Sequence, residues 1–301
     1  MKIKFTTVSI IALFMSVSCQ NDNRTNTSTN SENIDTAAAS SDYTLTKADQ
    51  FEDYLLALDT TDINSITKAT NKFSEIFSKD DSIQNDEGIL KFLAYQEKVE
   101  LNGNEKIIDE RKDYAQLVDI EYNNKKAPEE LSAFHRQINN NGFRIVQSEG
   151  MYYIKSYPTY IEQNFYAYAS PTMEIYLRQL AKENLEGFAN DAAIVIPFET
   201  FVQRTIWWED FGQSISNKHL QTKANEQYEA YLRYLTIGLN NTPAINYENK
   251  AEEYFVNAYA YLEEVYPTSE TYVTLKPYIE LIKRNKITEA KEMSLQMIKQ
   301  Q

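Results

Sequence analysis

The sequence has almost no cysteine, since Cys19 is the only one among 301 residues. A single cysteine cannot form a disulfide within the chain, so we expect the folded part to be stabilised by its own hydrophobic core. A chain of this length can bury enough apolar surface to fold without covalent cross-links. The one cysteine is therefore available for a different chemical role.

Histidine and glycine are also scarce, with two histidines and seven glycines. His135 and His219 form no HExxH pattern, so no zinc-hydrolase ligands are recognisable, and we interpret both as solvated helix residues. The chain has no GxSxG segment and no glycine-rich phosphate loop, which excludes the recognisable serine hydrolases, dinucleotide-binding proteins and P-loop enzymes. The sequence thus predicts no catalytic residue, no cofactor and no metal site of a known type.

The segment 80–88, DDSIQNDEG, comes closest to a metal-binding composition. Its acidic and amide residues lack the alternating spacing of a calcium loop. We interpret it instead as a solvated loop between two helices, with Asp86 as a helix cap. A calcium site is kept as the weaker alternative.

Basic residues are too few to balance the acidic ones: 30 Lys and Arg stand against 44 Asp and Glu, which gives a net charge of −14. If Lys2 and Lys4 are removed with an N-terminal signal, 28 basic residues stand against 44 acidic ones and the net charge becomes −16. Such a surface would repel a phosphate backbone. Nucleic acid is therefore not an expected partner.

The apolar run at the N-terminus, residues 5–17, is too short to cross a bilayer, which takes about 20 residues. It follows a positively charged start and ends in small residues, a pattern typical of a secretory signal. Ser16 and Ser18 satisfy the small-x-small rule, so ordinary secretion with cleavage after Ser18 is one alternative. The other alternative depends on Cys19, which directly follows that cleavage position.

The stretch MSVSC, residues 15–19, resembles the lipobox of bacterial lipoproteins, and in particular the relaxed lipoboxes of Bacteroidota. It departs from the usual pattern because Ser16 stands where leucine is common. Asp22 follows soon after, as acidic residues tend to do in that group. The resemblance implies a signal peptide over residues 1–18 and a diacyl group on Cys19. That lipid would anchor the chain at an extracytoplasmic membrane surface, expected to be the bacterial outer membrane.

Residues 19–42 are expected to form a flexible, lipidated tether. Between residues 20 and 41 nearly every side chain is small or polar, so the segment cannot bury enough apolar surface to offset its ordering entropy. As a flexible coil of roughly 22 residues, it would span on the order of 25 Å. The folded part is then expected over 43–301, as one helical domain or as two subdomains, 43–141 and 142–301.

Apolar residues recur at helical spacing from Thr46 onward, and Phe51, Tyr54, Leu55 and Leu58 give the first example. Short connections between successive helices imply antiparallel neighbours. We therefore predict a mostly α fold of packed antiparallel helical hairpins with one small β-hairpin element. The helices are expected over residues 46–59, 62–77, 87–101, 105–122, 128–138, 159–169, 171–186, 198–212, 218–239, 247–266, 270–282 and 287–299.

The β-hairpin is predicted over residues 143–156, FRIVQSEGMYYIKS, where β-branched and aromatic residues flank a Glu-Gly pair. This pair suits a two-residue turn, because glycine readily takes positive φ. The turn would place Ile145 opposite Ile154 and bury that face of the hairpin. A short strand, or an extended lead-in to a helix, is also expected at AAIVIP, residues 192–197.

The middle of the chain contains in order the segments NGFRIVQSEGMYYI, SPTMEIYLRQLAKEN, NDAAIVI and WWEDF. This order is similar to that of uncharacterised bacterial extracytoplasmic proteins with a hairpin-helix-helix core. The similarity covers residues 141–212 of this chain. It implies the local arrangement of elements and no activity.

Two aromatic features are candidate contact surfaces. Tyr153 belongs to a dense group of tyrosines and phenylalanines at 152–168, which suits a glycan or peptide surface but also an ordinary boundary between core and solvent. In the helix FVQRTIWWEDF, Trp207 and Phe211 lie opposite the apolar face, on which Glu209 falls. Either this helix is buried between two layers and Glu209 has a hydrogen-bonding partner, or Trp207 and Phe211 form an exposed patch.

These patterns together predict a cell-envelope lipoprotein that acts as a binding or structural module on an extracytoplasmic face. Its partners would be the membrane, through the lipid on Cys19, and a glycan, a peptide or another protein. The alternative is an extracytoplasmic enzyme of unrecognised type that uses Glu209 as a buried acid. A periplasmic solute-binding protein is less favoured, because such proteins usually have two α/β lobes that this sequence does not predict.

Overall fold

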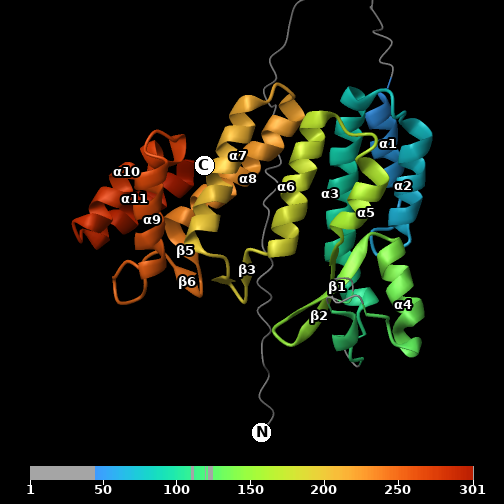
Figure 1. The fold of residues 1–301 in the computed structure, drawn as a ribbon, viewed down its shortest axis with the longest axis horizontal. Coiled ribbons are helices and arrows are strands. Elements are labelled where there is room, and N and C mark those ends of the chain that lie inside the picture. Colours follow the sequence, from blue (N-terminus) through green and yellow to red (C-terminus); the bar gives the residue numbers. More distant parts are fainter. Residues whose placement is uncertain (1–44, 110–111, 119, 121–124, 301) are drawn as a thin grey trace, which may run out of the picture. The chain divides into compact units, whose positions relative to one another are not determined.

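The computed structural model describes residues 45–109, 112–118, 120 and 125–300, and the chain in these ranges is predominantly helical (Figure 1). The described residues form eleven α-helices, one short 3-10 helix and three two-stranded antiparallel sheets. The prediction of a mostly α fold with a small β-hairpin is confirmed. The predicted signal peptide and tether, including Cys19, lie outside the described residues. In the ranges given above, no helix has both the length and the hydrophobicity needed to cross a bilayer.

The first three helices are α1 (Lys47–Leu56), α2 (Ser65–Ile76) and α3 (Ser82–Ile107), which lie side by side (Figure 1). At the start of α1, the Thr46 hydroxyl accepts a hydrogen bond from the Asp49 amide at 3.0 Å. The Asp49 carboxylate in turn accepts one from the Thr46 amide at 3.0 Å. This reciprocal capping box satisfies two amide donors and fixes the beginning of the helix at the predicted place.

The third helix differs from the prediction, which placed two helices over residues 87–101 and 105–122. The first of these and the gap after it belong to the single helix α3. The predicted break falls at Asn-Gly-Asn, residues 102–104, which are poor helix formers. In the structure the Asn104 side chain accepts a hydrogen bond from the Ile154 amide at 2.7 Å, and this tertiary contact offsets the low helix propensity.

The predicted hairpin is confirmed as β1 (Phe143–Ser148) and β2 (Met151–Ser156), with Ile145 opposite Ile154. The two turn residues have φ values of 53° and 78°, as a tight turn with left-handed backbone at both positions requires. Ile145 and Ile154 are buried, so the predicted face points into the core. A 3-10 helix, η1 (Ala115–Leu117), lies against β1 and falls within the range where the fourth helix was predicted.

Three further helices follow around the hairpin: α4 (Glu129–Asn140), α5 (Pro158–Phe165) and α6 (Pro171–Glu186). The start of α6 is the one predicted. There the Ser170 hydroxyl accepts a hydrogen bond from the Met173 amide at 3.1 Å, which is the N-cap interaction. Proline in the first turn suits this position, because its missing amide proton would have no partner inside the helix.

Asp86 is not a solvated cap, and this prediction is corrected. Asp86 lies within α3 and is only 2% exposed. Its carboxylate accepts hydrogen bonds from the Ser170 amide at 2.9 Å and from the Ser170 hydroxyl at 2.6 Å, so it connects α3 to the start of α6. Burial raises the pKa of Asp86, while the bonds from Ser170 act in the opposite direction. The partner lies far away in the sequence, which is why spacing alone could not identify it.

The C-terminal part is helical as predicted, but two boundaries differ. The helix predicted over 218–239 ends at Ile237, because residues 238–239 form a short strand. The predicted helix over 247–266 starts only at Glu253, because the preceding residues form a loop closed by an antiparallel bridge between Ile245 and Ala251. α7 packs against both α8 and α9, so it is covered on two sides. The five helices are α7 (Phe198–Ser214), α8 (Lys218–Ile237), α9 (Glu253–Val265), α10 (Glu270–Lys283) and α11 (Ile287–Gln300).

Two very short ladders complete the secondary structure. β3 (Ala189–Asn190) pairs with β4 (Ala193–Ile194), and β5 (Gly238–Leu239) pairs with β6 (Thr242–Pro243). Of the strand predicted over residues 192–197, only residues 193–194 form a strand, which is β4. Buried apolar side chains from the N-terminal helices through the C-terminal ones belong to one hydrophobic core cluster.

Candidate binding groove

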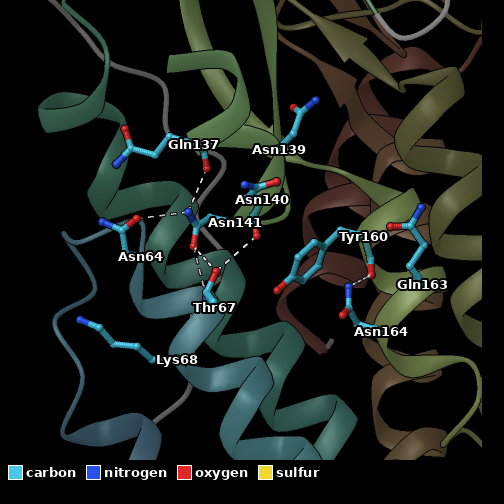
Figure 2. A pocket seen from close by; sticks show the side chains of 10 residues that line it. All are labelled: Asn64, Thr67, Lys68, Gln137, Asn139, Asn140, Asn141, Tyr160, Gln163 and Asn164. Atoms are coloured by element: carbon cyan, nitrogen blue, oxygen red, sulfur yellow. Dashed lines mark hydrogen bonds between the residues drawn. The ribbon is translucent and has the colours of Figure 1, made fainter. Parts of the chain in front are cut away.

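A cavity of about 670 Å³ lies where the start of α2, the end of α4 and the helix α5 meet (Figure 2). Seven of the ten side chains that line it are carboxamides, and we call these ten residues the amide groove. None of the ten is aliphatic or acidic. The lining consists of Asn64, Thr67, Lys68, Gln137, Asn139, Asn140, Asn141, Tyr160, Gln163 and Asn164.

The amide run at the end of α4 is held in place by the turn that follows it. Gly142 has a φ of 74°, a left-handed conformation that lets the chain leave the helix and enter β1. A Cβ at this position would lie 2.8 Å from the Tyr160 ring and 2.9 Å from Nε2 of Gln96. The Gln96 side chain also donates a hydrogen bond to the Gly142 carbonyl at 2.9 Å. The turn therefore fits closely between α3 and α5 and leaves no room for a side chain.

Asn141 forms the floor of the amide groove and is only 3% exposed. Its Oδ1 accepts hydrogen bonds from the Thr67 amide at 3.3 Å and from the Thr67 hydroxyl at 2.7 Å. Its Nδ2 donates to the Gln137 carbonyl at 2.9 Å and to Oδ1 of Asn64 at 3.3 Å (Figure 2). The carboxamide thus uses two acceptor and two donor positions, which is its full capacity. It fixes α2 and α4 relative to each other.

α5 provides the opposite side of the amide groove. Tyr160, Gln163 and Asn164 follow the i, i+3, i+4 spacing that places side chains on one face of a helix. The Tyr160 hydroxyl is hydrogen-bonded to the Thr70 hydroxyl at 2.7 Å, so this ring is anchored to α2. Burial raises the pKa of Tyr160, so the phenol stays neutral at physiological pH.

The rim of the amide groove carries side chains that can contact a ligand. Gln137, Asn140 and Gln163 are exposed, and within the described part of the chain their carboxamides have no hydrogen-bond partner. Lys68 is the one cationic side chain of the lining, and its ammonium group pairs with Asp62 at 3.0 Å. In Figure 2 it points away from the other groups. The groove therefore offers uncharged donors and acceptors to solvent.

The chemistry of the amide groove is that of recognition. Its lining has no carboxylate, imidazole or thiol, and its one amine, on Lys68, is paired with Asp62 at 3.0 Å. Its two hydroxyl groups, on Thr67 and Tyr160, already form hydrogen bonds within the protein. Carboxamides donate and accept hydrogen bonds without transferring protons. The arrangement can bind and orient a polar molecule.

The structure separates the aromatic residues that the sequence singled out. Phe211 is 7% exposed and belongs to the core, so it is not part of an exposed patch with Trp207, and that expectation is corrected for Phe211. Trp207 is half-buried and stacks on Phe211, with ring centroids 4.8 Å apart and an interplanar angle of 14°. Tyr153 lies on β2, is also half-buried, and does not line the amide groove.

Glu209 is a helix cap for a neighbouring helix. It is 6% exposed, and its carboxylate accepts hydrogen bonds from the amides of Glu270 at 2.7 Å and Thr271 at 2.9 Å, and from the Thr271 hydroxyl at 2.6 Å. These donors lie at the N-terminus of α10, where a negative charge is favoured by the helix dipole. The alternative in which α7 is buried and Glu209 has a hydrogen-bonding partner therefore describes the structure.

Another hydrogen-bonded carboxylate, the half-buried Glu183, was not identified from the sequence. It accepts hydrogen bonds from the indole of Trp208 at 2.9 Å, the amide of Gln179 at 2.6 Å and the hydroxyl of Tyr231 at 2.7 Å. Arg204 also donates to the Tyr231 hydroxyl at 3.3 Å. Burial raises the pKa of Glu183, and these hydrogen bonds and the nearby guanidinium oppose that shift. Its partners come from α6, α7 and α8, so the network holds these helices together.

The described residues contain no recognisable metal site. No group of three or more His, Cys, Asp or Glu side chains among them is arranged to hold a metal ion. His219 is exposed on α8, as expected of a solvated histidine. The ring of His135 lies 3.1 Å from the Asn139 amide, one turn further along α4.

The amide groove could not be found by sequence reasoning, because its residues come from three distant segments. The only local signal is the density of amides in QINNN, residues 137–141, which predicts a helix end equally well. Comparisons with known proteins add no information: no family model, no curated protein and no solved structure matches the chain. A functional proposal therefore has to be based on the chemistry of the chain itself.

Proposed function

We propose that this protein is a cell-envelope lipoprotein whose folded domain acts as a binding module on an extracytoplasmic face. The amide groove is the observation that carries the binding role. The groove has a volume of about 670 Å³, is open to solvent, and is lined mainly by carboxamides. Its rim offers several unpaired carboxamides to solvent.

The lipid anchor is supported by the N-terminal sequence alone. A short apolar run, small residues and Cys19 in the lipobox-like stretch MSVSC favour lipidation over ordinary secretion. The polar segment that follows suits a spacer between the membrane and the domain. Together these features favour attachment to the outer membrane of a bacterium, with the domain exposed to the surrounding solvent.

A binding role is favoured over the alternative of an enzyme that uses Glu209. That carboxylate does not line the amide groove, and it accepts three hydrogen bonds from the start of α10. A catalytic acid needs access to a substrate, and Glu209 is 6% exposed. Stabilisation of the start of α10 is therefore the favoured reason for a buried carboxylate at Glu209.

The anchor can be tested by replacing Cys19 with serine in the full chain. We expect the wild type to partition with membranes and to incorporate a fatty-acid analogue, because two acyl chains give stable attachment. The Cys19→Ser chain should appear in the soluble fraction without the label. A wild type that takes up no label would contradict the lipoprotein proposal.

The binding role can be tested by calorimetric titration of the soluble Cys19→Ser full chain with two classes of uncharged ligand. One class consists of the oligosaccharides maltohexaose, cellohexaose, xylohexaose and mannohexaose. The other consists of capped peptides rich in serine, in asparagine or in leucine. We expect saturable binding of at least one ligand with a Kd below about 1 mM. Failure of every ligand in both classes would contradict the proposed role of the groove.

A further inference from the structure

We infer that the amide groove binds a neutral oligosaccharide, through the exposed carboxamides of Gln137, Asn140 and Gln163. This inference rests on the proposed binding function and specifies the ligand class. The argument uses the chemistry of the lining, its charge and its lack of apolar side chains. The first property fits the hydroxyl groups of a sugar, the second disfavours a charged ligand, and the third disfavours a peptide.

The first property is the pairing of donors and acceptors. A carboxamide presents an N–H donor and a carbonyl acceptor side by side in one plane. Two neighbouring hydroxyl groups of a sugar ring offer the same combination, because each hydroxyl can donate and accept. In Figure 2, Gln137 lies on one side of Asn141 and Gln163 on the other, with Asn140 between them. The rim can therefore contact several hydroxyl groups of one extended molecule.

The second property is charge. The lining has no carboxylate to pair with a cationic ligand, and its single cation, Lys68, is already paired with Asp62 at 3.0 Å. The chain as a whole has a net charge of −14, which disfavours the approach of an anion. A charged ligand would lose hydration on entering the groove without gaining a counter-charge. These facts favour an uncharged ligand.

The third property separates a sugar from a peptide. Peptides are commonly held by pockets for apolar side chains or by an unpaired strand edge. The groove has no aliphatic residue, its one aromatic ring belongs to Tyr160, which is 9% exposed, and its lining comes from helices and their ends. A peptide would thus find neither feature. A sugar can be held by hydrogen bonds to its hydroxyl groups, which the rim carboxamides can supply.

The groove is also prearranged for a ligand. Asn141 uses its full hydrogen-bonding capacity within the protein, and Tyr160 is anchored by the Thr70 hydroxyl. The floor therefore does not have to rearrange when a ligand binds, and only the exposed rim side chains lose freedom. Prearrangement lowers the entropic cost of binding. We therefore expect each rim carboxamide to make its own contribution to the affinity for the ligand.

The test compares rim variants with a matched control in the soluble Cys19→Ser full chain. Asn140→Ala and Gln163→Ala each remove one rim carboxamide, whereas Gln296→Ala removes an exposed carboxamide from α11, outside the groove. For whichever of the four oligosaccharides binds, we expect the two rim variants to raise the Kd about three- to tenfold each. Gln296→Ala should leave the Kd unchanged. Thermal melting should be the same for all three variants, because the replaced side chains are exposed.

The outcomes distinguish this inference from the proposed function. If a peptide binds and its binding is lost in the rim variants, the groove is a binding site but its ligand is not an oligosaccharide. Binding of an oligosaccharide with no change in Kd in either rim variant would place the ligand elsewhere and overturn the inference. Binding of hexagalacturonate in preference to the four neutral sugars would overturn the argument from charge. Failure of all ligands would overturn the function and the inference together.

Discussion

Trp208→Ala should lower the free energy of unfolding by about 3 to 5 kcal/mol, as large-to-small substitutions in a protein core do. The side chain is fully buried, with 0% exposed, and its ring packs edge-on against Tyr176 at a centroid distance of 5.7 Å. The substitution would leave a cavity between α6 and α7. It would also remove the indole N–H that donates a hydrogen bond to Glu183 at 2.9 Å, so this half-buried carboxylate would lose one of its donors.

Denaturant titrations read by the change in midpoint would measure this loss. Trp207→Ala is the matched control, since the neighbouring indole is half-buried and stacks on Phe211. We expect that variant to lose only about 1 to 2 kcal/mol, in proportion to the smaller area that it buries. Trp208→Phe should lie between the two, because it keeps a ring and loses the N–H. Equal and small losses for both alanine variants would contradict the placement of Trp208 in the core.

The elements that the sequence predicted well are those whose signals are local. Apolar spacing and the caps Thr46 and Ser170 predicted the starts of α1 and α6, because capping involves residues three positions apart. The hairpin register followed from one Glu-Gly turn, since a two-residue loop determines every opposing pair. Fold class could be derived in the same way, because it depends on the number and type of such elements.

The errors occurred where distant contacts override local propensity. α3 continues through Asn-Gly-Asn because Asn104 bonds the hairpin backbone, and Asp86 is buried because Ser170 lies opposite it. Sequence spacing contains no information about either partner. The amide groove was missed for the same reason. Asn141 acquires its role only when Thr67 from α2 is brought beside it, and an asparagine at a helix end predicts nothing more than a helix end.

The need of Glu209 for a partner could be predicted, but the identity of the partner could not. A carboxylate on the apolar face of a buried helix must be hydrogen-bonded, which follows from the cost of burying an unpaired charge. The donors are mainly backbone amides at the start of α10, and any helix start could have supplied them. Sequence reasoning therefore found the residue and left open whether it was catalytic or structural.

Glu209→Ala should lower the free energy of unfolding by about 3 to 5 kcal/mol, because two amides and one hydroxyl at the start of α10 would lose their acceptor and the helix dipole its counter-charge. Thr271 is fully buried, with 0% exposed, so water cannot readily replace the carboxylate. Glu209→Gln keeps one acceptor oxygen and the shape of the side chain, and we expect it to lose about half as much.

Asp210→Ala is the control for this pair of variants, since Asp210 is the adjacent acid on α7 but is exposed. It should change the midpoint of denaturant unfolding little, as exposed substitutions usually do. The same titrations decide between the two roles considered for Glu209. A carboxylate that served as a catalytic acid would be dispensable for folding, so an alanine variant as stable as the wild type would contradict the capping role. If both variants lose stability, and the alanine variant loses more than the glutamine variant, then stabilisation of α10 is the reason for an acid at this position.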